Sequence, residues 1–442
     1  MSLFRKSLLP LLLYYFITLS LFSQEIKTGE VYAYARKIVD TMASQSMHGR
    51  GYVNGGDSIA ANYLKNEFSR IGLKSFGNDY YQRMSFPINT FPDKIEFEIR
   101  SRVAQFEHNC IPGKIFLIDA SCKGVSSEFR IRFFDSTMCS SKAQKKFLKK
   151  LKPEDFILVD DLDVKDKTKK DVLNKIKNNS MKASGIIEPV TKLTWHQSQV
   201  VSDYCKIQIL ADSTFLYDER WFDNGRILVE NKFITNHKSQ NVIGYIPGSV
   251  YPDSFIVYSA HYDHLGHMGK DVYFPGANDN ASGCAMLLNL ANYYSKPENI
   301  PKYSIAFMAF CGEEVGLLGS KYYTENPYFP LKNIKFVFNM DIMGTGEEGI
   351  TVVNGTIFQK EFDKLKEINT QNNFIKDVKI RGKAANSDHY FFSEKGVKAF
   401  FIYSMGGIKA YHDIYDRPET LPLNEFENMF KLITKFGESL QN

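Results

Sequence analysis

Cysteine is scarce and unpatterned in this chain of 442 residues, which contains six cysteines and two tryptophans. No two cysteines stand three positions apart, so the Cys-x-x-Cys spacing of zinc fingers and zinc ribbons is absent. Cys284 and Cys311 fall within apolar segments and are expected to be buried thiols. The other four allow more than one disulfide pairing, which the sequence leaves open. They are Cys110, Cys122, Cys139 and Cys205.

A strong excess of one charge is also missing. The chain has 55 Lys and Arg against 50 Asp and Glu, for a formal net charge of +5. This near balance argues against a dedicated nucleic-acid-binding protein. We find no internal repeat and no low-complexity segment, so solenoid and fibrous architectures are not indicated.

Long apolar runs are limited to one, Ser7–Phe22, near the N-terminus. Arg5 and Lys6 precede it and the small Ser23 follows it, a pattern typical of a signal peptide over residues 1–23. An uncleaved membrane anchor is the alternative, since the run is near the lower length limit for a span. We expect an exported protein, secreted or periplasmic, with no stable membrane association after cleavage.

The remaining sequence divides into three parts by its pattern. Residues 24–111 are the N-terminal part of the main domain, residues 112–235 a small β-rich insertion with a charged helical tract, and residues 236–442 the part of the main domain that carries chemistry. In this last part, short apolar runs rich in β-branched and aromatic residues alternate with helical patterns. The pattern predicts an α/β fold with a mostly parallel central sheet flanked by helices. The runs are Ser254–Ala260, Ser304–Cys311, Lys335–Met340 and Ala399–Tyr403.

Ionisable side chains follow these predicted strands or lie in nearby loops. In an open α/β sheet, functional residues gather at the carboxyl ends of the parallel strands. We therefore expect residues that are distant in sequence to converge at one edge. They are His261, Asp263, Asp279, Glu313, Glu314, Asp341 and His412.

The chemistry of this set points to two metal ions. Imidazole and carboxylate without thiolate suit zinc in a hydrolytic site, and two ions about 3.5–4 Å apart need one bridging carboxylate. Asp279 is the expected bridge. His261 and Asp341 would complete one zinc site, and Glu314 and His412 the other, with a water between the ions.

Two carboxylates remain beside these ligands. Asp263 stands two residues after His261 and is expected to accept the second N–H of that imidazole, which would fix its tautomer. Glu313 is expected to act as a general base that takes a proton from the bridging water.

Five segments together resemble the two-zinc aminopeptidase family, whose relatives include glutamate carboxypeptidase, glutaminyl cyclases and the transferrin receptor ectodomain. They are Ser259–His264, Pro275–Gly283, Cys311–Ser320, Asn339–Gly344 and Tyr411–Asp413. The resemblance extends from about Tyr32 to Thr420. It implies a zinc-exopeptidase fold of the phosphorylase/hydrolase-like type and the same metal positions as the chemistry above.

The resemblance also implies a role for Tyr411, which would polarise the scissile carbonyl and stabilise the oxyanion. The insertion at 112–235 lies where some family members carry a protease-associated domain. One position departs from the family, which usually has a small hydroxyl residue after the last metal histidine. Here that position holds Asp413. We expect it to change the edge of the loop and to leave metal binding intact.

The favoured function is an exported zinc-dependent aminopeptidase that acts on peptide or protein N-termini. An aromatic rim that includes Tyr262 and Phe274 would favour apolar first residues. Three alternatives stay open: a glutaminyl cyclase, a carboxypeptidase or dipeptidase, and a non-catalytic receptor-like binding module. Tyr411 argues against the cyclase, in which Trp typically precedes the last histidine ligand. A basic pocket formed by Lys270 or Arg381 would mark a carboxypeptidase.

Overall fold

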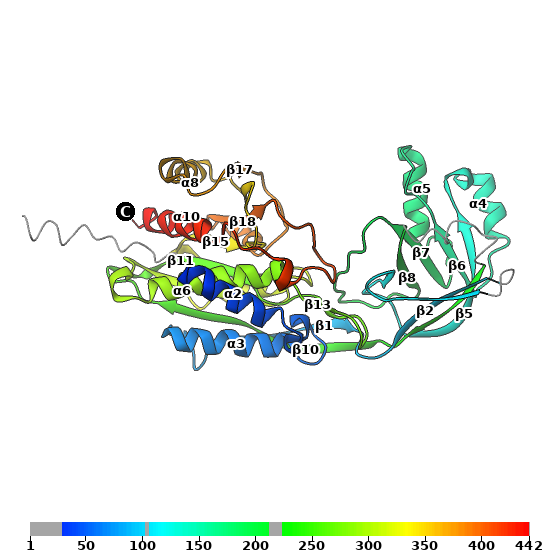
Figure 1. Ribbon diagram of the computed structural model, residues 1–442, viewed down its shortest axis with the longest axis horizontal. Coiled ribbons are helices and arrows are strands. Elements are labelled where there is room, and N and C mark those ends of the chain that lie inside the picture. The colour runs from blue at the N-terminus through cyan, green and yellow to red at the C-terminus, as the bar shows by residue number, and fades with distance from the viewer. Residues whose placement is uncertain (1–28, 102–105, 212–222, 442) are drawn as a thin grey trace, which may run out of the picture.

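The computed structural model describes residues 29–101, 106–211 and 223–441, and the expected signal peptide lies outside these ranges. The described chain forms two lobes, one α/β and one mainly β, joined by long strands and loops (Figure 1). None of the helices in the described ranges is long and apolar enough to cross a membrane.

An eight-stranded sheet forms the centre of the α/β lobe, in the order β1-β10-β14-β11-β15-β18-β16-β17. The four central strands, β14, β11, β15 and β18, run parallel, and the pairs β1–β10, β10–β14 and β16–β18 are antiparallel. This confirms the predicted α/β class with a mostly parallel centre. The strands are β1 (Tyr81–Thr90), β10 (Lys232–Ile246), β11 (Tyr251–His261), β14 (Tyr303–Phe310), β15 (Ile334–Met340), β16 (Gly349–Val353), β17 (Val378–Ile380) and β18 (Ala399–Met405).

Helices cover both faces of this sheet, which explains why its central strands are apolar without alternation. Along β14, Phe307 packs in one core and its neighbour Met308 packs in the core on the opposite face. One face is covered by α2 (Glu30–Met42), α3 (Gly56–Ile71), α6 (Gly283–Tyr294), α8 (Gln359–Asn372) and α10 (Phe426–Ser439). The other face is covered by α7 (Leu318–Glu325) and α9 (His389–Glu394).

The β-rich lobe contains a second eight-stranded sheet, in the order β3-β2-β9-β5-β6-β7-β8-β4. Its strands are β2 (Ile95–Ser101), β3 (Phe106–Cys110), β4 (Phe116–Ile118), β5 (Val125–Phe134), β6 (Asp155–Val159), β7 (Gly185–Val190), β8 (Cys205–Leu210) and β9 (Asn224–Val229). The sheet therefore begins before residue 112, the expected start of the insertion, because β2 and β3 pair with each other and β2 also pairs with β9. The charged tract of this lobe forms the helices α4 (Ser141–Leu148) and α5 (Lys167–Lys177).

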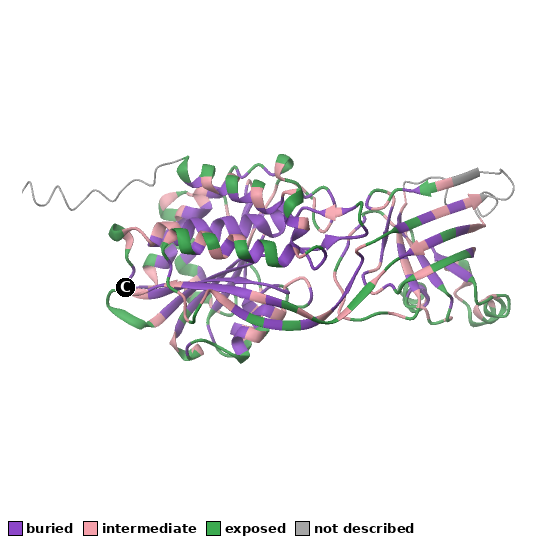
Figure 2. Ribbon diagram, turned by 90° about the horizontal axis from the view of Figure 1, so that it is seen from below, coloured by how far each residue is buried: buried purple, intermediate pink, exposed green. Residues whose placement is uncertain are grey.

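The two lobes share buried side chains where they meet. The hairpin of β12 (Gly266–His267) and β13 (Tyr273–Phe274) belongs to the half of the chain that follows the insertion. Phe274 from this hairpin packs in the apolar core of the β-rich lobe, beside Trp195. Buried segments continue through this junction in Figure 2. The β-rich lobe is thus anchored next to the loops that follow the central strands.

Candidate metal centre

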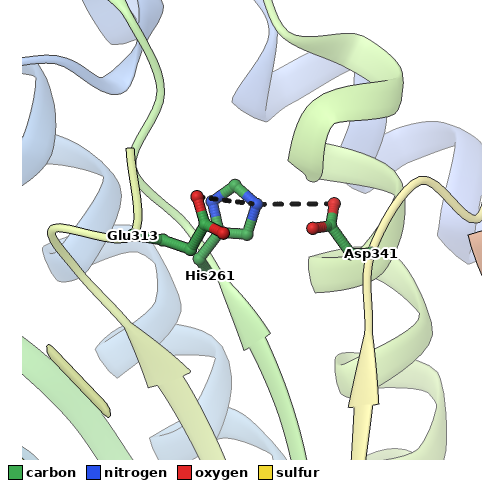
Figure 3. A group of neighbouring side chains, drawn as sticks. All are labelled: His261, Glu313 and Asp341. Carbon is green, nitrogen blue, oxygen red and sulfur yellow. Dashed lines mark ion pairs between the residues drawn. The ribbon is translucent and has the colours of Figure 1, made fainter. Parts of the chain in front are cut away.

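Two of the expected metal ligands lie directly at the carboxyl ends of the central parallel strands. His261 is the last residue of β11, and Asp341 directly follows β15. Figure 3 shows His261 between Asp341 and Glu313, which lies in the loop after β14. Because β14, β11 and β15 are adjacent and parallel, their ends meet at one edge and bring these side chains together. Asp279 comes from the turn before α6.

The carboxylate of Asp279 lies between two histidines and faces each with a different oxygen. Its Oδ1 is 3.3 Å from Nε2 of His261, and its Oδ2 is 3.1 Å from Nε2 of His412. Asp341 Oδ1 lies 3.4 Å from His261 Nε2, and Glu314 Oε2 lies 3.2 Å from His412 Nε2. The side chains therefore form two imidazole–carboxylate pairs, His261 with Asp341 and His412 with Glu314. The carboxylate of Asp279 lies between the two pairs and is shared by them.

Burial and charge shift the pKa values of these groups in opposite directions. Burial raises the pKa of Asp279, but hydrogen bonds from His261 and His412 outweigh it and hold that pKa well below the ordinary value. Burial lowers the pKa of His412, but Glu314 and Asp279 outweigh it and raise that pKa to about 11. For Glu313, burial and the neighbouring carboxylates Glu314 and Asp341 raise the pKa well above its ordinary value.

The residues present fit a pair of zinc ions. Imidazole and carboxylate are the ligand types that zinc takes in hydrolytic sites. Asp341 Oδ1 is buried and has no hydrogen-bond partner among the described residues, so it requires a partner of another kind. No lysine or arginine of the described ranges forms an ion pair with Asp279, Glu314 or Asp341. Cations bound at the two pairs would balance this group of carboxylates.

A cavity of about 210 Å³ opens onto the cluster. Tyr411 lines it with 43% of its surface exposed, and its ring stacks on His412 with the centroids 4.0 Å apart. Burial and the nearby carboxylates raise the pKa of Tyr411, so its phenol keeps its proton at physiological pH. The lining is formed by His261, Asp279, Glu313, Asp341, Ile342, Arg381, Asn386, Phe401, Tyr403, Tyr411 and His412.

Comparison with known sequences identifies this part of the chain. Residues 241–437 match the profile of Peptidase family M28. They belong to that family. Aminopeptidase YwaD of Bacillus subtilis is 31% identical over 194 residues, which cover 42% of this chain and 41% of the relative. A probable zinc metalloprotease of Pyricularia oryzae is 37% identical over 116 residues, covering 25% of this chain and 23% of the relative. The matched region thus spans less than half of these curated relatives.

Solved structures extend the likeness in fold beyond the M28 region. The zinc aminopeptidase BSAP from Bacillus subtilis superposes with a TM-score of 0.65, at 17% identity, over 92% of this chain and 94% of that one. A Peptidase M28 precursor from Shewanella amazonensis gives a TM-score of 0.68, at 15% identity, over 93% of each chain. Both lobes of the described chain therefore share the fold of these proteins.

Asp263 lies beside His261, as the spacing predicts. It contacts the imidazole through its main-chain carbonyl oxygen, whereas the expected contact was through its carboxylate. Nδ1 of His261 lies 3.2 Å from the main-chain carbonyl oxygen of Asp263, to which it donates, and 3.8 Å from its carboxylate. The carboxylate accepts a hydrogen bond from the Tyr52 hydroxyl at 2.7 Å and one from the Glu313 amide at 3.3 Å. Asp263 thus links the His261 strand to the loop that carries Glu313.

His264 lies closer to the M28 site than the sequence suggests. Its side chain is fully buried, and its Nδ1 is 2.7 Å from Oε1 of Glu314. His264 is not one of the five expected ligands. Its spacing of three residues from His261 was the available signal, but spacing does not reveal which carboxylate the ring reaches.

Arg50 lies outside residues 241–437, but its side chain supports the metal-ligand cluster. It is fully buried, and its guanidinium donates to five main-chain carbonyl oxygens, at distances from 2.8 to 3.1 Å. Gly49 precedes it at φ +59°, and a Cβ on Gly49 would lie 2.5 Å from the Phe274 carbonyl oxygen. The sequence marks this segment only as a glycine-flanked loop. The carbonyls belong to Met42, Tyr262, Pro275, Gly276 and Asp279.

Asp416 holds the other side of the Asp279 turn. Its two carboxylate oxygens accept hydrogen bonds from the amides of Asn278 at 2.8 Å and Asp279 at 2.9 Å. Arg50 and Asp416 therefore bind the carbonyl and amide groups of one short segment. Together they position the shared carboxylate.

The prediction that Tyr262 and Phe274 line the substrate rim was wrong. Both side chains are fully buried, and neither contributes to the cavity. Tyr262 directly follows β11, and its hydroxyl donates to the Gln240 carbonyl at 2.6 Å, away from the residues that line the cavity. Phe274 stacks on Trp195 in the core of the β-rich lobe. The apolar part of the cavity is formed by other residues of the M28 region, Ile342 and Phe401.

Asp413, the position that departs from the family pattern, anchors the loop around His412. Its carboxylate accepts from the amides of Tyr411 at 3.3 Å and Tyr415 at 2.9 Å. It also pairs at 3.2 Å with Lys192 of the β-rich lobe. Asp413, where the family usually has a small hydroxyl residue, thus connects the loop around His412 to the β-rich lobe.

Proposed function

We propose that this chain is a zinc-dependent aminopeptidase that hydrolyses the first peptide bond of peptides with a free N-terminus. The observation that carries the proposal is Asp279, shared between two imidazole–carboxylate pairs. His261 and Asp341 would hold one zinc ion, and Glu314 and His412 the other. When bound, the ions would polarise the scissile carbonyl and lower the pKa of a water molecule.

Glu313 is proposed as the general base. It lines the cavity beside the ligand Glu314, with its Oε2 4.0 Å from Nε2 of His261. Its raised pKa gives the carboxylate a high affinity for the proton of an attacking water. As the water oxygen bonds to the carbonyl carbon, the proton passes to Glu313. Glu313 then donates it to the amide nitrogen as the C–N bond breaks, which releases the first residue and a new amine.

Tyr411 is proposed to stabilise the charge that develops on the carbonyl oxygen. Its phenol lines the cavity and remains protonated, so it can donate a hydrogen bond to the oxyanion. The stacked His412 ring holds the Tyr411 ring in place. Asp263 acts indirectly, through its contacts to His261 and the Glu313 amide.

The sequence relatives support the metal and the reaction class. One is an aminopeptidase and another a probable zinc metalloprotease. The family match over residues 241–437 contains all five proposed ligands. Export is proposed from the apolar run Ser7–Phe22, with the β-rich lobe as a protease-associated-type insertion into the peptidase domain.

The test is release of free amino acid from matched unblocked and N-acetylated peptides. Each is assayed with the protein as purified, after chelation, and after zinc is restored. Release from unblocked peptides alone, lost on chelation and regained with zinc, is the expected result. Hydrolysis of the blocked peptides from their C-terminus would favour a carboxypeptidase.

Two further results would replace the proposal. A Gln-initiated peptide that loses ammonia but keeps its first residue would indicate a glutaminyl cyclase. Stoichiometric zinc without turnover of any peptide would favour a binding module.

A further inference from the structure

One wall of the cavity carries a positive charge that no carboxylate of the described ranges neutralises. Arg381 directly follows β17 and lines the same cavity as His261 and His412. Its guanidinium donates to the Tyr403 hydroxyl at 3.4 Å and forms no ion pair with another described residue. The side chain is exposed, so its remaining donors are open to solvent.

A neighbouring lysine shows the opposite behaviour. Lys383, two residues further on, forms an ion pair with Glu394 of α9. The same segment therefore contains one neutralised cation outside the cavity lining and one free cation within it. A cation without a counter-ion in a substrate cavity is available to an anionic group of the ligand.

The groups around Arg381 match a carboxylate on a short aliphatic chain. Tyr403 and Asn386 supply a hydroxyl and an amide at the cavity lining, and Ile342 and the buried Phe401 supply apolar surface. Guanidinium binds carboxylate through paired N–H donors, and a hydroxyl or amide can satisfy a remaining lone pair. The apolar surface would contact methylene groups.

The same cavity is also lined by acidic residues, Asp279, Glu313 and Asp341. With metal ions bound at these residues, a substrate would have its first amide bond beside them and could extend a carboxylate to Arg381. Two carboxylates of a peptide could bind Arg381 in this way. One is the side chain of a first Asp or Glu, and the other is the C-terminus of a dipeptide.

We propose that Arg381, assisted by Tyr403, binds a carboxylate of the substrate and gives this enzyme a preference for anionic substrates. The inference rests on the aminopeptidase function proposed above and adds its substrate class. It replaces the expected preference for apolar first residues, which depended on Tyr262 and Phe274.

Two substrate pairs separate the sources of the carboxylate. Glutamyl and glutaminyl p-nitroanilides differ only in the side chain, and Ala-Ala and Ala-Ala amide differ only at the C-terminus. The charged member of at least one pair is expected to have a kcat/KM about tenfold higher than its neutral partner, the value of one charge-assisted hydrogen bond. Which pair shows the ratio identifies the source.

The decisive variants are Arg381→Met and Lys379→Met. Arg381→Met should abolish the ratio and change kcat/KM for the neutral partner by less than about threefold, because the charge contact is absent there. Lys379 is an exposed cation on β17 outside the cavity lining, so Lys379→Met should keep the ratio. Tyr403→Phe should reduce it in part.

The inference is overturned by equal rates within both pairs, by a ratio that survives Arg381→Met, or by a ratio that Lys379→Met removes equally. If the zinc-loaded protein cleaves none of the four substrates, the aminopeptidase function itself fails. Calorimetric titration then decides the carboxylate site. L-glutamate must bind more tightly than L-glutamine, or Ala-Ala more tightly than its amide, and Arg381→Met must remove the difference. Equal binding would refute the site.

Discussion

The Trp195 carbonyl oxygen accepts a hydrogen bond from Nδ1 of His412 at 2.9 Å, and the Trp195 amide donates to the His412 carbonyl at 2.9 Å. Trp195 follows β7 and belongs to the β-rich lobe. With Nδ1 donating to this carbonyl, Nε2 of His412 faces Asp279 and Glu314, and it becomes available to a metal when it gives up its proton. The β-rich lobe therefore orients a proposed metal ligand of the other lobe.

Lys192, also from the β-rich lobe, holds the loop around His412 and can be substituted without changing a proposed metal ligand. Its ammonium donates to the carbonyls of Lys409 at 2.9 Å and Tyr411 at 3.2 Å, in addition to its ion pair with Asp413. Lys192→Met is expected to weaken zinc binding by about tenfold, because the loop that carries Tyr411 and His412 loses anchoring contacts. Zinc titration and kcat/KM measure the effect. Lys170→Met on α5, an exposed lysine of the same lobe, is the control. Equal zinc affinity in both variants would contradict the prediction.

The adjacent residues Glu313 and Glu314 should respond differently to the same substitution. Glu313→Gln is expected to keep both zinc ions and lose activity by about 10²–10⁴-fold, since it removes a proton acceptor and not a ligand. Glu314→Gln is expected to lose zinc at the His412 side. Metal analysis and kcat of the two variants check this. Retained activity in Glu313→Gln would eliminate it as the base.

Zinc affinity should rise with pH. The raised pKa of His412, about 11, means that the apoprotein holds a proton on this imidazole at neutral pH. Only the neutral ring can bind a metal, so zinc must displace the proton, and the displacement becomes easier as pH increases. Calorimetry of zinc binding in two buffers with different ionisation enthalpies should report proton release. Identical enthalpies in the two buffers would show that no proton leaves.

Arg50→Met should destabilise the fold by about 3 kcal/mol or more. The substitution leaves buried carbonyl oxygens without donors, each of which carries a desolvation penalty. Arg50→Lys should recover only part of the loss, since an ammonium has three donors and lacks the planar fork. Urea unfolding of the apoproteins measures this without a contribution from metal binding. Arg226→Met, at an exposed arginine of β9, should have little effect.

Cys122 and Cys205 should form the disulfide of this protein under oxidising conditions. Their sulfur atoms lie 2.6 Å apart in the core of the β-rich lobe, and both side chains are fully buried. Closing a loop between positions 83 apart would stabilise the lobe by up to about 4 kcal/mol. Non-reducing peptide mapping after treatment with glutathione disulfide detects the bond. A Cys110–Cys139 linkage in its place would contradict this pairing.

Much of the fold was predictable because local pattern and tertiary burial agree in the central sheet. The run Ala399–Tyr403 is apolar on both faces, as helices cover both, and it forms most of β18. The long strand β10 was missed, since its first half is exposed and polar and its pattern resembles a loop. β2 and β3 were placed outside the insertion because their pairing with distant β9 has no local signature.

The sequence by itself determined the candidate ligand set. β11 ends at His261, Asp341 directly follows β15 and Glu314 lies in the loop after β14, and the parallel strands bring these ends together. Only the tertiary structure decided what surrounds that set. His264 faces Glu314, Tyr262 turns away from the cavity and Arg381 enters it. Trp195 reaches His412 across 217 positions of sequence. These contacts depend on how side chains from separate segments pack against one another, which no local pattern of residues encodes.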